Sequence, residues 1–239
     1  MHTTAEAPLI EASHDLRRKL CLVLDVDDLE VARRLGQQLR PWFGVAKVGL
    51  ELFSAAGPDA IETMVDLGYE VFADLKLHDI PTTVGRASRV LGSLGASYVT
   101  MHAFGGVDML RAGVEGLATG AEQAGLDVPC ALAVTILTSD GGAPPHVLPQ
   151  RVTAAVEAGC GGIVCAVSDV AEARRIGPEL TIVTPGIRLA GGATHDQARA
   201  ATPQEAVDAG ADLLVIGRAV THAEDPVVAA AELVESLSL

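Results

Sequence analysis

The sequence predicts a single α/β domain in which eight parallel strands close into a barrel with helices on the outside. Short apolar runs recur eight times and amphipathic stretches separate them. The 239 residues are also close to the usual length of a (β/α)8, or TIM, barrel. The apolar runs are continuous rather than alternating, which is typical of parallel strands covered on both faces.

The expected strands follow one another at similar intervals along the chain. They are residues 19–26, 44–50, 69–76, 96–103, 128–137, 161–167, 180–186 and 211–217. Helical stretches such as "LEVARRLGQQLR" and "PQRVTAAVEAG" lie between them, and several end in glycine just before the next strand, a frequent helix C-terminal signal. We therefore expect residues 19–239 to form the barrel and residues 1–18 to form a tail or a short covering helix.

A doubly wound open sheet is the main structural alternative. Such a sheet would carry a glycine-rich phosphate turn after its first strand, whereas the first strand here runs into "DVDD". The barrel is therefore the favoured interpretation. It also predicts where the chemistry lies, because the active sites of this fold are built at the carboxyl ends of the strands.

The composition argues against several classes of function. With 49% hydrophobic residues the chain can fill a large core, yet no apolar run reaches the roughly 18 residues of a membrane span. A net charge of −14 without a basic stripe argues against binding nucleic acid. The first residues lack a basic-then-apolar signal pattern, so we expect a cytoplasmic protein. The four cysteines lack metal-ligand spacing, and three of them lie inside apolar runs, where a free cysteine is expected to act as a small buried apolar side chain.

Charged residues interrupt the end of the third strand, in "VFADLKLHDIPTTV". Asp74 and Lys76 are two positions apart, so on a regular strand they project to the same side, about 6.6 Å from each other. Lys47 lies late in the neighbouring strand, and Asp79 in the following turn either completes an alternating array or reaches a neighbouring subunit. A buried ion-pair network is a poor way to gain stability alone, so we interpret the cluster as functional. His78 is expected to be a structural hydrogen-bonding residue.

Two segments near the end of the chain are typical of an anion site. "TPGIRLAGGATHDQAR" follows the seventh strand and carries Arg188 and Gln197, and "VIGRAVTHAEDP" places Gly217 and Arg218 after the eighth. The loops after these two strands commonly bind phosphate in such barrels. Gly217 lets the backbone approach a ligand and Arg218 supplies a forked cation. We therefore predict a phosphorylated substrate, with the long loop 138–149 as a closing lid.

Several motifs together resemble the orotidine 5′-phosphate decarboxylase family. They are "LVLDVDD", "KVGLELF", "DLKLHDIPTTV", "HAFGG", "AVTILTS", "TPGIR" and "VIGRAVT", spread from about residue 20 to 235. The resemblance implies a homodimer that converts orotidine 5′-monophosphate to UMP and carbon dioxide, the last step of de novo pyrimidine nucleotide synthesis. It also implies that the reaction needs no cofactor and no metal.

The same resemblance assigns roles to residues. Lys76 would donate a proton to C6 of the pyrimidine after carbon dioxide leaves, and Asp74 would face the departing carboxylate. Asp79 and Thr83 would serve the site of the partner subunit. The other implied substrate-binding positions are Asp25 and Lys47 for the ribose hydroxyls, Thr138 for the base, and Arg188, Gln197, Gly217 and Arg218 for the phosphate.

Two other functions fit parts of the same pattern. A magnesium-dependent sugar-phosphate decarboxylase or aldolase would use the acids of a D-x-K-x-x-D string as metal ligands, although the "HDIPTTV" continuation and the "AVTILTS" strand favour the first reading. A non-catalytic nucleotide-binding protein would need Arg188 and Arg218 but not the Asp74–Lys76 pair. Chelation and a direct decarboxylation assay distinguish the three.

Overall fold

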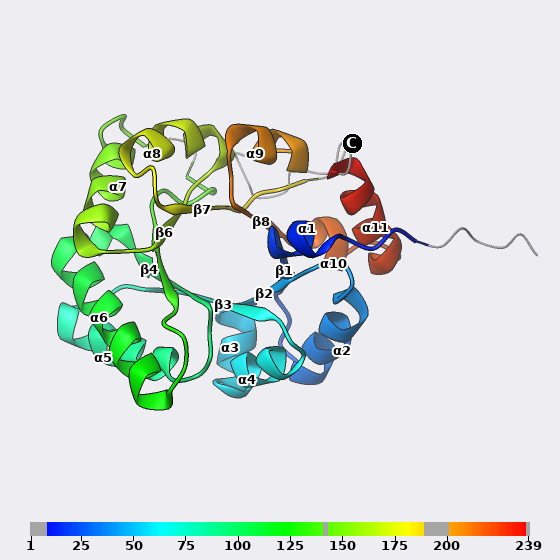
Figure 1. The fold of residues 1–239 in the computed structure, drawn as a ribbon, viewed down its shortest axis with the longest axis horizontal. Coiled ribbons are helices and arrows are strands. Elements are labelled where there is room, and N and C mark those ends of the chain that lie inside the picture. Colours follow the sequence, from blue (N-terminus) through cyan, green and yellow to red (C-terminus); the bar gives the residue numbers. More distant parts are fainter. Residues whose placement is uncertain (1–8, 141–142, 189–200, 238–239) are drawn as a thin grey trace, which may run out of the picture.

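A computed structural model describes residues 9–140, 143–188 and 201–237 of the chain. Eight parallel strands form a closed barrel in chain order, and β8 pairs with β1 to complete it (Figure 1). The strands are β1 Leu20–Leu24, β2 Val45–Gly49, β3 Glu70–Leu77, β4 Tyr98–His102, β5 Cys130–Val134, β6 Gly162–Val164, β7 Thr181–Thr184 and β8 Leu213–Ile216. The predicted fold class is confirmed, and each strand falls within its predicted range except β3, which extends one residue further.

Helices follow the strands and cover the outside of the barrel (Figure 1). The α-helices are α1 His14–Arg18, α2 Leu29–Leu39, α3 Leu50–Ala56, α4 Asp59–Asp66, α5 Pro81–Gly92, α6 Gly106–Ala124, α7 Val147–Ala158, α8 Val170–Ile176, α9 Pro203–Ala209, α10 Arg218–Thr221 and α11 Pro226–Leu237. Two short 3₁₀ turns, η1 Ala103–Gly105 and η2 Val167–Asp169, follow β4 and β6. Among the helices in the described ranges, none is long and apolar enough to cross a membrane.

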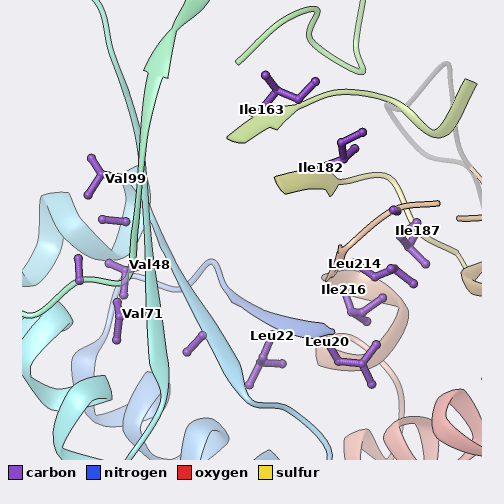
Figure 2. Close-up of a cluster of buried hydrophobic side chains, with 14 of the residues drawn as sticks. Leu20, Leu22, Val48, Val71, Val99, Ile163, Ile182, Ile187, Leu214 and Ile216 are labelled. Atoms are coloured by element: carbon purple, nitrogen blue, oxygen red, sulfur yellow. The ribbon is translucent and has the colours of Figure 1, made fainter. Parts of the chain in front are cut away.

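Two hydrophobic layers explain why the sequences of the strands are continuous apolar runs. One layer lies between the barrel and its helices and includes Leu20, Leu22 and Ile216 (Figure 2). The other fills the barrel interior and includes Cys21 and Val23, the positions that alternate with the first set. Because successive side chains of a strand point to opposite faces, both faces of each strand are buried. Polar side chains are therefore accommodated mainly at the ends of the barrel.

The segment before β1 packs against the barrel through backbone and side-chain hydrogen bonds. The indole Nε1 of Trp42 donates to the carbonyl of Ile10 at 2.8 Å, and the N–H of Gly44 donates to the carbonyl of Arg17 at 2.8 Å. A Cβ at Gly44 would lie 2.7 Å from that same carbonyl oxygen. The absence of a side chain at Gly44 is thus what lets α1 approach the start of β2.

Candidate active site

Four side chains at the carboxyl ends of β1, β2 and β3 form a chain of alternating charge. The Nζ of Lys47 lies 3.0 Å from Oδ1 of Asp25 and 3.4 Å from Oδ2 of Asp74. The Nζ of Lys76 lies 2.8 Å from Oδ1 and 2.9 Å from Oδ2 of Asp74. The order is Asp25, Lys47, Asp74, Lys76. Asp74 therefore connects the two lysines, and both of its oxygens accept from ammonium groups.

The fourth member of this array is Asp25 rather than Asp79. Asp79 is exposed, and its Oδ1 accepts the N–H of Ile80 at 2.7 Å. No ion pair joins Asp79 to Lys76 within the described part of this single chain. Of the two sequence-based possibilities for Asp79, the geometry thus disfavours membership of the array within its own chain.

Burial and charge act in opposite directions on the two innermost members of the array. Their side chains are only 10% exposed for Lys47 and 13% exposed for Asp74. Burial alone would raise the pKa of Asp74, but the ammonium groups of Lys47 and Lys76 outweigh it and hold that pKa below its ordinary value. Burial would likewise lower the pKa of Lys47, but Asp74 and Asp25 outweigh it and raise that pKa. Both groups are therefore ionised at neutral pH.

The backbone of β3 is irregular where it carries the array. Lys76 has a φ of 48°, and it is the only non-glycine residue with positive φ in the described part of the chain. For a residue with a side chain this left-handed conformation costs roughly 1–3 kcal/mol, and such strain collects at functional sites. The expectation of a regular strand through Lys76 is wrong. The bend, rather than regular alternation, turns the ammonium back onto Asp74.

Gly49 makes room for the Asp25–Lys47 contact. It ends β2 and precedes α3, and its φ of −88° is accessible to any residue. A Cβ at this position would lie 2.7 Å from Oδ1 of Asp25 and 2.8 Å from Nζ of Lys47. The glycine is therefore required by the two side chains beside it rather than by its own backbone conformation.

A cavity of about 460 Å³ opens at the carboxyl ends of the strands, within the usual range for small-molecule sites. Apolar side chains from the barrel interior, among them Val23, Phe72 and Val215, form part of its lining. Eight of the predicted site residues line it: Asp25, Lys47, Asp74, Lys76, Thr138, Arg188, Gly217 and Arg218. One cavity thus contains both the charge array from β1–β3 and the two arginines that follow β7 and β8.

Two of the predicted positions do not line the cavity, and a third cannot be placed in it or outside it. Asp79 and Thr83 are exposed at the start of α5, and Gln197 lies outside the described residues. Among the polar side chains that line the cavity, sequence reasoning missed three, namely Glu51, Thr221 and His222. Each follows the carboxyl end of β2 or β8 within a few residues. That position is the signal that could have identified them.

The two arginines and Gly217 shape the opposite side of the cavity. Arg188 is 9% exposed, and its Nη1 donates to the carbonyl of Ile187 at 2.8 Å. A Cβ at Gly217 would come no closer than 3.6 Å to Val23, so packing within the chain does not require glycine there. The missing side chain instead leaves cavity volume beside Arg218. Such a region suits a planar or tetrahedral anion that accepts from guanidinium groups.

The described residues show no cluster suited to a metal ion. Within those ranges, no group of three or more His, Cys, Asp or Glu side chains is arranged to hold one. In the charge array, the ligand positions that a cation would need on Asp74 are occupied by the two ammonium groups.

The closed barrel, with a polar cavity at the carboxyl ends of its strands, is typical of an enzyme of the (β/α)8-barrel class, and the two arginines of the cavity suit an anionic ligand. Comparison with known proteins then specifies the family. The chain belongs to the orotidine 5′-phosphate decarboxylase / HUMPS family, whose model matches residues 18–233.

The similarity to individual proteins extends over nearly the whole chain. A protein of Anaeromyxobacter dehalogenans named orotidine 5′-phosphate decarboxylase is 43% identical over 222 residues, which cover 92% of this chain and 98% of that protein. One of the same name from Moorella thermoacetica is 41% identical over 233 residues, covering 92% of each. The crystal structure of orotidine 5′-phosphate decarboxylase from Lactobacillus acidophilus superposes with a TM-score of 0.75 at 34% identity, covering 92% of this chain and 98% of that one.

Proposed function

We propose that this chain decarboxylates orotidine 5′-monophosphate to UMP and carbon dioxide, the last step of de novo pyrimidine nucleotide synthesis. The observation that carries the proposal is the ammonium of Lys76, held by both oxygens of Asp74 in a cavity that also contains Arg188 and Arg218. The family to which the chain belongs supports the same reaction. A nucleotide whose phosphate lies at the arginines would extend its base toward the charge array.

The chemistry needs a fixed cation beside C6 of the pyrimidine. When the bond between C6 and the carboxylate breaks, carbon dioxide leaves and the electron pair stays on C6, where no carbonyl group is placed to accept it. The ammonium of Lys76 stabilises this developing negative charge and then transfers a proton to C6, after which the neutral amine regains a proton from water. The product is UMP with a new C6–H bond.

Asp74 has two roles in this proposal. Its ionised carboxylate holds the ammonium of Lys76 in place, and the low pKa of Asp74 keeps that carboxylate charged. It also faces the carboxylate of the substrate, and the repulsion between the two disappears when carbon dioxide leaves. Binding of the distant phosphate supplies the free energy that opposes this repulsion.

The other predicted site residues bind the substrate. Asp25 and Lys47 contact the ribose hydroxyls, and their mutual hydrogen bond of 3.0 Å supports a shared polar site on the cavity wall. Thr138 contacts the base. The phosphate is bound by Arg188, Gln197, Gly217 and Arg218.

We also propose a homodimer in which Asp79 and Thr83 enter the site of the partner subunit. Both are exposed beside the cavity of their own chain rather than within it. Ile80 and Phe104, which follow the carboxyl ends of β3 and β4, are 66% and 69% exposed, and exposed apolar side chains that lie together are typical of an interface. The ring of His78, two residues before Ile80, lies 5.6 Å from that of Phe104, so the segments after β3 and β4 meet at this rim of the barrel. A second copy of the chain is the partner that would cover this rim.

Subunit complementation tests the shared site. Lys76→Ala and Asp79→Asn chains are each expected to be nearly inactive as homodimers. Unfolded and refolded together in equal amounts, they form mixed dimers with one intact site, so about a quarter of the wild-type activity should return. If the mixture stays as inactive as its components while mass measurements show mixed dimers, Asp79 does not act across subunits.

A cytoplasmic location completes the proposal. Cys21, Cys130 and Cys160 are free thiols and are largely buried. Reduced cysteines are typical of cytosolic proteins, whereas secreted domains usually pair them.

The decisive experiment adds orotidine 5′-monophosphate to purified protein in excess EDTA and follows the pyrimidine absorbance. Decarboxylation that persists under chelation supports the proposal. Activity that disappears with EDTA and returns with magnesium would favour the metal-dependent sugar-phosphate lyase. A protein that binds UMP tightly yet never releases carbon dioxide would be the non-catalytic nucleotide-binding protein.

A further inference from the structure

Thr100 lies on β4, next to the charge array, and contacts both Asp74 and Lys76. Its side chain is fully buried and is not part of the cavity lining. The Oγ1 of Thr100 accepts the backbone N–H of Lys76 at 2.9 Å and donates to Oδ1 of Asp74 at 3.1 Å. A single hydroxyl group thus contacts the backbone of one residue and the carboxylate of the other.

We propose that Thr100 is a positioning residue of the decarboxylase site, whose hydroxyl fixes the Asp74 carboxylate relative to Lys76. The inference rests on the proposed function, since it concerns the geometry of that reaction. Thr100 does not touch the cavity, so it acts through Asp74 and Lys76 rather than on the substrate.

The pairing of β3 with β4 explains why a side chain is needed here. Ala73 is paired with Val99 and Leu77 is paired with Met101, so three residues of β3 lie opposite Thr100 alone. Such a bulge leaves backbone groups without their usual partners on the neighbouring strand. The N–H of Lys76 is one of them, and the Thr100 hydroxyl accepts it in place of a backbone carbonyl. The same contact supports the left-handed backbone of Lys76.

The direction of the second hydrogen bond follows from the first. Because the Thr100 oxygen accepts from Lys76, its one proton is available for a nearby acceptor. Oδ1 of Asp74 lies at 3.1 Å, whereas the carbonyl of Ala73 lies at 3.5 Å. The carboxylate is the nearer and the more strongly charged acceptor. This donation also helps the two lysines to keep the pKa of Asp74 low.

A second threonine provides a matched control. Thr135 follows β5 directly, is as fully buried as Thr100, and donates from Oγ1 to the carbonyl of Val164 at 2.8 Å. It neither lines the cavity nor contacts the charge array. Losing its hydroxyl removes a buried hydrogen bond of the same kind from a neighbouring part of the barrel.

The test compares Thr100→Val, Thr100→Ser and Thr135→Val in the purified enzyme. For Thr100→Val we expect kcat to fall at least about tenfold with KM for orotidine 5′-monophosphate changed less than about threefold. The acid limb of its kcat profile should move to higher pH, because Asp74 loses a donor that favours its ionised form. Thr100→Ser keeps the hydroxyl and should recover most of the activity. Thr135→Val should lower Tm while keeping kcat and the acid limb.

The outcomes separate this inference from the proposed function. If the wild-type chain decarboxylates the substrate but Thr100→Val keeps its kcat and acid limb, the positioning role is overturned and the function stands. Equal losses in Thr100→Val and Thr135→Val would also overturn it. If the wild-type chain never releases carbon dioxide, the proposed function fails instead. If Thr100→Val does not fold, Thr100→Cys replaces it in the test, because a thiol is only a weak hydrogen-bond donor. Unchanged kinetics in Thr100→Cys would then overturn the positioning role.

Discussion

The two ends of β3 both carry an acid next to a basic group, yet they differ in what surrounds them. At the amino end, Glu70 accepts from the hydroxyl of Tyr98 at 3.1 Å and pairs with Arg18 at 3.4 Å. At the carboxyl end, Asp74 bridges Lys47 and Lys76. The first group joins α1, β3 and β4 and lines no part of the cavity, whereas the second lies on its wall.

The position of a charged group in the barrel therefore distinguishes a structural ion pair from one that belongs to the candidate active site. The Glu70 pair is solvent-accessible at Arg18, so its attraction is screened and contributes little to stability. Asp74 and Lys47 are largely buried, so their charges are screened less by water and interact more strongly than those of the Glu70 pair. Active sites of this fold use the carboxyl ends of the strands, and stabilising contacts gather at the amino ends.

The largest expected effect comes from removing the ammonium at the carboxyl end. Lys76→Ala should lower kcat by at least about 10⁴-fold, because the proton donor and the nearby positive charge are lost together. Binding of UMP should weaken far less, since the arginines are untouched. Steady-state kinetics and calorimetric titration with UMP check both parts. Full decarboxylation by this variant would remove Lys76 from its assigned role.

A smaller loss is expected from crowding the array without removing a charge. In Gly49→Ala the new methyl group would displace Asp25 and Lys47, whose atoms lie 2.7 and 2.8 Å from the Cβ position. Displacements of this kind cost on the order of 10²-fold in kcat/KM.

The Gly217→Ala variant tests crowding at the opposite side of the cavity, beside Arg218. The nearest side-chain atom of Val23 is 3.6 Å from the Cβ position, so the new methyl group fits within the chain and occupies cavity space instead. We expect Gly217→Ala to raise KM for the substrate with a smaller change in kcat, as measured by steady-state kinetics.

Stability should depend on the ionisation of Asp74 in a definite direction. Its pKa in the folded chain is below the ordinary 3.8, so the folded state binds fewer protons than the unfolded state near that pH. The stabilisation is fully present above about pH 3.8 and is lost as pH falls through the folded-state pKa.

Urea unfolding of the wild-type chain and of Asp74→Asn measures this term. At pH 7 the variant should be less stable by about 3 kcal/mol, because the buried ammonium of Lys47 and the partly exposed ammonium of Lys76 lose their shared acid. The difference should shrink as the pH is lowered below 3.8, where the wild-type carboxyl group becomes neutral as well. A difference that stays constant down to acidic unfolding would contradict the assigned ionisation.

The smallest effect is expected at the amino end. Glu70→Gln retains a side chain that can accept from Tyr98 and removes only the charge opposite Arg18. The free energy of unfolding should change by less than about 1 kcal/mol, and kcat should stay within about twofold of wild type. A loss of activity in Glu70→Gln as large as that expected for Gly49→Ala would contradict the conclusion that the charges at the amino end of β3 are structural.

The barrel and most of the charged residues around its cavity could be predicted from local patterns in the sequence. Continuous apolar runs and glycine-terminated helices are local patterns, and parallel strands necessarily gather their carboxyl ends at one side. Lys47, Asp74 and Arg218 could therefore be assigned to a common site before any distance was known. The order of the strands around the barrel followed from the regular alternation of strands and helices.

The pairing of groups within that site depends on contacts between strands that are distant in the sequence. The pairing of β1 with β2 brings Asp25 to Lys47, a contact between residues 22 positions apart. The bulge opposite Thr100 depends on how β3 and β4 fit together, which no local pattern in "FADLKL" indicates. Hydrogen bonds and ion pairs act over about 3 Å, so their partners are fixed by long-range packing rather than by position along the chain.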